Sequence, residues 1–209
     1  MQTSLIIKNL LVIAAITVPL AANAESNFQT GAASPLTATA HVDFQITIPK
    51  FLFLRVGTGT GTAAGGYATL ATIDEVTWAP TAAQVGTGVL AGAGGDLTGG
   101  AETAVVVANN GNVTLSSTTT GALSDGAGDT ISYAKIVTTA SHNTTATTLA
   151  APTLADGATT TTSVIAVGKI VQQDAKWTYT YANNTTPPAG IYGGVGINAG
   201  RVTYTASVP

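Results

Sequence analysis

The amino-acid sequence predicts an all-β protein in which antiparallel strands pack as a sandwich of two sheets. Apolar and polar residues alternate strictly over residues 37–48, which is the period of a half-buried strand. No segment shows the 3.6-residue period of an amphipathic helix, and good helix formers are sparse. Short apolar stretches are separated by turns rich in glycine, asparagine and proline, a spacing that is typical of β-sandwiches.

The start of the chain has the features of a secretion signal. Lys8 precedes an apolar run over residues 10–20, and Ala22-Asn23-Ala24 provides the small-x-small pattern of a cleavage site. We therefore expect a signal peptide over residues 1–24, a flexible leader over 25–36 and a β-sandwich domain over 37–209. The apolar run is too short for a comfortable membrane span and no other stretch qualifies, so we expect an exported protein without one.

The alternating segment, residues 37–48, begins the expected domain. At about 3.4 Å per residue it would reach about 40 Å, which is long for a globular strand. Pro49 ends it, because proline cannot donate to a central ladder. Residues 51–56 follow at once and are apolar on both faces, apart from Arg55, as in a strand of a sandwich core. The apolar face of the alternating segment consists of Ala38, Ala40, Val42, Phe44, Ile46 and Ile48.

Several later stretches also predict strands. Residues 104–108 and the alternating residues 113–116 flank Asn109-Asn110-Gly111-Asn112, a strong turn signal, so we expect a hairpin there. A further strand is expected over residues 130–138, and the Thr- and Ala-rich tract 139–162 is expected to be of low complexity. The last strand, within residues 200–209, should turn one alternating set toward the core: Val202, Tyr204, Ala206 and Val208.

Composition limits the possible functions. The chain has no cysteine, so stability must come from packing and strand pairing rather than from disulfides. Charged residues make up 8% of the sequence and the formal net charge is −3, which excludes the basic footprint of a nucleic-acid-binding protein. So few charges are unusual for a free soluble monomer and favour a surface that contacts copies of itself, although an ordinary Thr- and Ala-rich exported β-protein has the same composition.

Catalytic and cofactor motifs are not evident. His41 and His142 have no nearby set of catalytic partners, and no nucleophile motif accompanies them. Residues 59–61 match part of a dinucleotide fingerprint, but more glycines follow where a helix is required. Residues 125–129 could offer oxygens to calcium, but two carboxylates around glycines favour a plain turn. We therefore expect no enzymatic activity, cofactor or metal.

Aromatic residues allow two interpretations. Trp78, Trp177, Tyr179 and Tyr181 could form a platform on which sugars stack. Alternation of the last three instead favours the buried face of a core strand, and we prefer that interpretation. The Asn-x-Ser/Thr triplets beginning at Asn112, Asn143, Asn183 and Asn184 are expected by chance in a Thr-rich sequence.

Both ends of the expected mature chain resemble pilin subunits of the chaperone–usher pathway, above all the cysteine-free major subunits of colonisation factors. Residues 37–49 followed by 51–56 are similar to the donor segment and first strand of those pilins. Pro188-Ala189-Gly190-Ile191-Tyr192, Gly196 and the alternating strand 201–208 are similar to their C-terminal region. Val208 stands where the family often has tyrosine, the leader is additional, and residues 57–176 carry no motif of the family.

The resemblance implies an immunoglobulin-like sandwich that lacks one strand and is completed by strand exchange with a neighbour. It also implies a structural fibre subunit at the cell surface, in adhesion or biofilm, whose partners are identical subunits, a periplasmic chaperone and an outer-membrane usher. The donor would be the apolar face of residues 38–48. The acceptor groove would comprise Phe51, Phe53, Val56, Val202, Tyr204, Ala206 and Val208.

The sequence leaves an alternative open. The chain could be a self-contained secreted β-sandwich, such as a matrix component or a carbohydrate-binding module, in which residues 37–48 form the first strand of its own sheet.

Overall fold

The computed structural model describes residues 25–32 and 34–209, and the expected signal peptide at residues 1–24 lies outside them. The chain divides into two units, Met1–Ile48 and Pro49–Pro209. The described part of the chain is all-β, with a single 3₁₀ turn, η1 (Tyr133–Lys135), and no α-helix. No helix in this part is long and apolar enough to cross a membrane.

The larger sheet of the second unit has five strands, all paired antiparallel. Its central strand β11 pairs with β5, β3 and β9, while β1 pairs with the outer edge of β5. The bounds are β1 (Leu52–Val56), β3 (Leu90–Ala91), β5 (Ala101–Ala108), β9 (Ile136–Ser141) and β11 (Val171–Tyr181).

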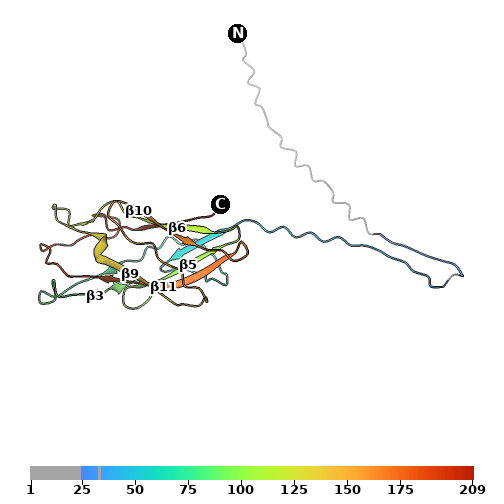
Figure 1. The fold of residues 1–209 in the computed structure, drawn as a ribbon, viewed down its shortest axis with the longest axis horizontal. Helices are drawn as coiled ribbons and strands as arrows, with labels where there is room; N and C mark the ends of the chain where they lie inside the picture. Colours follow the sequence, from blue (N-terminus) through green and yellow to red (C-terminus); the bar gives the residue numbers. More distant parts are fainter. Residues whose placement is uncertain (1–24, 33) are drawn as a thin grey trace, which may run out of the picture. The chain divides into compact units, whose positions relative to one another are not determined.

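The second sheet has three strands in the order β10-β6-β12, again antiparallel. They are β6 (Val113–Thr118), β10 (Thr159–Val164) and β12 (Thr203–Ser207). Two short pairs complete the unit: β2 (Val76–Thr77) with β4 (Ala93–Gly94), and β7 (Leu123–Ser124) with β8 (Thr130–Ile131). The arrangement in Figure 1 is consistent with the predicted β-sandwich, with β6 and β10 in one layer and β5, β9 and β11 in the other.

The core lies between these layers and is built from alternating strand residues. Trp177 is completely buried, and its indole N–H donates to the carbonyl of Leu149 at 2.8 Å. Its ring packs against that of Tyr204 with centroids 5.3 Å apart, and the Tyr204 hydroxyl lies 2.9 Å from the hydroxyl of Tyr179. The aromatic side chains of β11 therefore belong to the core, and the sugar-platform interpretation is wrong for them.

The predicted hairpin around residues 109–112 is incorrect. Its two strands, β5 and β6, form where expected but belong to different sheets. Because β1 and β11 already occupy both edges of β5, no edge remains to which β6 could pair. The turn therefore carries the chain across the core from one sheet to the other.

One further stretch differs from its prediction, and a second gains strands that the sequence did not assign. Residues 130–138 do not form one strand: η1 interrupts them, and the hydroxyl oxygen of Ser132 accepts a hydrogen bond from the backbone N–H of Ala134 at its start. The Thr-rich tract 139–162 is partly strand, because β9 continues to Ser141 and β10 begins at Thr159. The β-branched threonines fit a half-buried strand, with alternate side chains exposed.

Candidate functional site

The first unit presents an apolar segment without a strand partner. Among the residues described, 35–48 have no regular secondary structure, and each of them is exposed. The exposed fraction is 90% for Phe44, 85% for Ile46 and 74% for Val42. Exposed apolar side chains of this size on a stretch with unpaired backbone are a liability in a free monomer, which makes the segment a candidate binding element.

The second unit has an open edge at β1. Within residues 49–209 this strand pairs only with β5. The N–H of Gly57 donates to Thr103 O at 2.9 Å, and the N–H of Phe51 donates to the Asn109 side chain at 2.9 Å. The backbone groups of the odd-numbered residues therefore point toward β5. Since hydrogen-bonding direction alternates along an antiparallel strand, the backbone groups of Leu52, Leu54 and Val56 point toward the free edge.

The edge strand of the other sheet, β12, also has a free edge. Thr119 N–H donates to Ala158 O at 3.2 Å, so the backbone groups of odd-numbered residues in β6 point toward β10. The backbone groups of Thr118 and Ser116 therefore point toward β12. The backbone groups of Tyr204 and Ala206 then point away from β6, and no strand in the described chain pairs with them. Strands β1 and β12 lie next to each other without pairing. Both edges of this seam thus carry unpaired backbone groups on residues whose side chains face the core.

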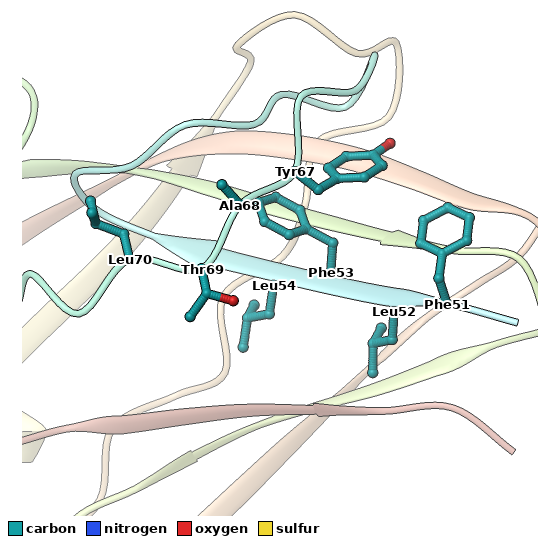
Figure 2. A pocket seen from close by; sticks show the side chains of 8 residues that line it. All are labelled: Phe51, Leu52, Phe53, Leu54, Tyr67, Ala68, Thr69 and Leu70. Atoms are coloured by element: carbon teal, nitrogen blue, oxygen red, sulfur yellow. The ribbon is translucent and has the colours of Figure 1, made fainter.

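A hollow of about 520 Å³, the edge groove, follows β1 (Figure 2). Side chains from both faces of β1 line it, which is possible only if it runs along the strand's edge. The ring of Tyr67 covers one side, with its centroid 5.6 Å from that of Phe51 and 4.7 Å from that of Phe53. The full lining is Phe51, Leu52, Phe53, Leu54, Tyr67, Ala68, Thr69 and Leu70.

The expected acceptor residues divide between the outer face of the larger sheet and the core between the two sheets. Phe51 stacks on Tyr67, and Phe53 packs with it on the outer face, against the small cluster of Ala63, Val105 and Val107. The remaining expected residues pack against the main core between the sheets: Val56, Val202, Tyr204, Ala206 and Val208. Leu52 and Leu54, which the sequence prediction omitted, lie on the core side with them. Counting back from Val56 in steps of two would have found both.

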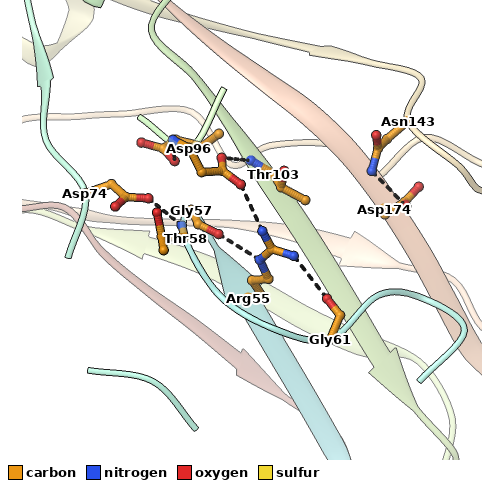
Figure 3. A network of polar contacts seen from close by, with 10 residues as sticks. Arg55, Gly57, Thr58, Gly61, Asp74, Asp96, Thr103, Asn143 and Asp174 are labelled. Atoms are coloured by element: carbon orange, nitrogen blue, oxygen red, sulfur yellow. Dashed lines mark hydrogen bonds and ion pairs between the residues drawn. The ribbon is translucent and has the colours of Figure 1, made fainter. Parts of the chain in front are cut away.

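A partly buried polar cluster anchors the end of β1 (Figure 3). The guanidinium of Arg55 donates to Gly57 O at 2.7 Å, to Gly61 O at 3.1 Å and to the Asp96 carboxylate at 2.9 Å. Asp96 also accepts from Thr103 N–H at 2.7 Å, so one carboxylate joins β1 to β5. Residues 59–61 are therefore a loop held by an arginine, and no helix follows them as a dinucleotide site requires.

Glu102 is the titratable group in this cluster whose pKa departs most from its ordinary value. Burial raises its pKa to about 8, and the neighbouring carboxylates Asp96 and Asp74 add to the effect. One oxygen from each of the three acids lies within 4.8 Å of the others, with Arg55 as the paired cation. Glu102 therefore holds its proton in the folded protein at neutral pH.

This arrangement predicts that stability falls as pH rises. Between pH 4.5, the ordinary pKa of this side chain, and about pH 8, the unfolded chain has released the Glu102 proton and the folded chain has not. This difference lowers the free energy of unfolding across that range, by on the order of a few kcal/mol in total. We expect Glu102→Gln to remove most of this decline in melting temperatures measured from pH 5 to pH 8.5. Glu75→Gln, the same change at an exposed site, should leave the slope unchanged. Equal slopes for the wild type and Glu102→Gln would contradict the assignment.

A second buried carboxylate anchors the loop after β9. Burial alone would raise the pKa of Asp174, but hydrogen bonds from Thr144 and Thr145 outweigh it and hold the pKa at about 2. The backbone N–H groups of Thr144 and Thr145 donate to it at 3.0 and 2.8 Å, and Asn143 donates at 3.0 Å (Figure 3). These contacts tie the loop to β11 and are structural in character.

The remaining candidates from the sequence do not assemble a site. The Asp125 carboxylate accepts N–H groups from Ala127, Gly128 and Asp129 at 2.8 to 3.1 Å, as in a plain turn, and these bonds lower its pKa. In the first unit, Nδ1 of His41 lies 2.7 Å from a carboxylate oxygen of Glu25 at an exposed position.

Comparison with known proteins gives no relative. No protein-family model matches the chain, and no curated protein or solved structure matches it significantly.

Proposed function

We propose that this protein is a structural, non-catalytic subunit of an extracellular fibre that grows head to tail by strand exchange. Residues 37–48 of one copy would enter the seam between β1 and β12 of the next. One observation carries the proposal: the chain combines an exposed, unpaired apolar segment with two adjacent strand edges whose inward-facing residues lack backbone partners. Addition of a strand at such an edge supplies main-chain hydrogen bonds, and alternate side chains fill the pockets.

Topology supports an incomplete immunoglobulin-like sandwich. In that fold one sheet has the order A-B-E-D and the other C-F-G. The order β1-β5-β11-β9 corresponds to A-B-E-D, and β6-β12 corresponds to C-F, with β10 as an addition beside C. In residues 49–209 no strand occupies the G position beside β12. The incoming segment would take this position and run antiparallel to β12, as G does to F.

Insertion has a structural requirement. A strand between two others needs about 4.8 Å on each side, so the seam must widen when the segment enters. Because β1 and β12 share no ladder, widening breaks no strand pairing. Each large side chain that moves from water into the seam contributes about 1.5–3 kcal/mol, and Val42, Phe44, Ile46 and Ile48 all qualify.

The cellular part of the proposal comes from the resemblance to chaperone–usher pilins, and the exposed surfaces are consistent with it. An open seam and a free apolar segment promote aggregation before assembly, so a periplasmic chaperone would cover the seam and an outer-membrane usher would exchange it for the next subunit. The protein would be exported through the periplasm and act at the cell surface in adhesion or biofilm.

Gel electrophoresis of the intact protein tests the proposal. Strand-exchanged subunits should run as a ladder of multimers in denaturing detergent without boiling, and the ladder should collapse to one band on boiling. A single monomer band in the unboiled sample from assembled material would support the self-contained sandwich and contradict strand exchange.

A further inference from the structure

Pro49 and the tips of two turns lie together at one end of the second unit, which we call the proximal end. Asn109 donates to Pro49 O at 2.8 Å, and Gly111 N–H donates to Lys169 O at 2.9 Å. Ala166 N–H donates to the Asn112 side chain at 2.9 Å, which adds the turn 165–170 to the same end. The C-terminal residue, marked in Figure 1, also lies here, because Asn110 donates to Pro209 O at 2.6 Å.

This proximal end carries an apolar patch where a turn is ordinarily polar. Val167 is 84% exposed, and Ile165 and Ile170 are each more than half exposed. A hollow of about 280 Å³ lies among these three side chains, with Thr147, Gln172 and Gln173 completing its wall. The patch is therefore both apolar and concave.

The loop 185–200 lies at the opposite, distal end. It precedes β12, which runs from the distal to the proximal end, and it is fastened to β7: Gly193 N–H donates to Ser124 O at 2.8 Å and Ser124 N–H to Asn198 O at 2.9 Å. Ile191 is 85% exposed on this loop, and Val195 and Ile197 are each more than half exposed. Pro187 and Pro188 restrict the backbone just before Ile191.

The chain brings these two ends together if strand exchange occurs. The apolar segment Ala38–Ile48 has eleven residues and so does β11, which spans the sandwich, so a seated segment would run the length of the acceptor. Running antiparallel to β12, it would leave the acceptor at the distal end. Pro49 follows Ile48 directly, so no linker separates the seated segment from the donor's own proximal end.

We infer that the two ends of residues 49–209 are themselves interfaces between copies of this chain. The concave proximal patch of one copy (Ile165, Val167, Ile170) packs against the exposed distal patch of the next (Ile191, Val195, Ile197). This inference rests on the proposed strand exchange and adds a contact between the bodies of neighbouring subunits. A contact between two different patches is head to tail, so it can repeat from subunit to subunit along an open fibre.

Paired cysteines test the inference in the full chain, because the natural sequence has none. Val167→Cys is combined in one chain with Ile191→Cys, Val195→Cys or Ile197→Cys, and assembled fibres are oxidised. The two positions lie at opposite ends of one subunit, too far apart for an internal disulfide. At least one pairing should give multimers that survive boiling without reductant and disappear with it.

The matched control pairs Val167→Cys with Thr161→Cys, an exposed position in the middle of β10, and should give no such multimers. If the unboiled ladder forms but no proximal–distal pair cross-links, or if the Thr161 control cross-links equally, the end-to-end contact is wrong and strand exchange stands. If the wild type forms no unboiled ladder, both proposals fail.

Discussion

Phe44→Asp is expected to abolish multimers while leaving a folded monomer. Phe44 is the largest side chain on the apolar face of residues 38–48, and it is 90% exposed in the free chain. A carboxylate at this position would be buried without a partner in the neighbour's seam, at a cost of several kcal/mol. In the monomer the same carboxylate stays in water and costs little. The unboiled ladder should therefore disappear, and the melting temperature of the monomer should not change.

Gln45→Asp is the matched control, because Gln45 is adjacent and lies on the polar face of the same segment. It introduces the same charge and should retain the ladder. The donor role would be refuted if Phe44→Asp still built normal multimers. An internal strand would be indicated instead if Phe44→Asp unfolded the monomer, and deletion of residues 25–48 provides an independent check of the same point.

Removal of residues 201–209 should cause aggregation or degradation of the exported protein. The deletion removes β12, whose side chains Tyr204 and Ala206 cover the core. Trp177 would lose the ring that packs against it and Leu115 would be uncovered, although both are completely buried in the intact chain. Exposure of this much apolar surface costs about 25 cal/mol per Å², and β6 would lose the partner on one of its edges.

Thr205→Lys provides the comparison for the deletion, since Thr205 lies on the exposed face of β12 and should tolerate the change. Yield and soluble fraction after periplasmic expression are the measurements. Normal yield and solubility of the truncated chain would mean that β12 is peripheral.

Within residues 49–209, the parts of the fold that the sequence predicted are those with strong local alternation. Residues 37–48 alternate most strictly of all, but they are exposed and form no strand in the described chain. Trp177, Tyr179 and Tyr181 alternate within β11 and are buried. Alternate residues of the last strand face the core as expected: Val202, Tyr204, Ala206 and Val208. Period-two patterns of this kind specify a face without knowledge of the partner strand.

The errors arise where the local pattern does not identify partners. The turn residues at 109–112 predict that the chain reverses direction there. They do not show that both edges of β5 are already paired, which is why β6 joins the other sheet. Residues 51–56 are apolar on both faces, so their pattern cannot show which side meets the core. The acids around Arg55 come from distant parts of the chain, and no spacing relates Asp74, Asp96 and Glu102 before the fold brings them together.

The central claim is that the free edges of β1 and β12 accept residues 37–48 from another chain. Its most direct test adds a synthetic peptide of residues 37–49 to the Phe44→Asp monomer and follows backbone hydrogen exchange. We expect a higher melting temperature and new protection at the amides that face the seam: Leu52, Leu54, Val56, Tyr204 and Ala206. A peptide carrying the Phe44→Asp change should have neither effect. Unchanged exchange at both edges with the natural peptide at saturating concentration would contradict the claim.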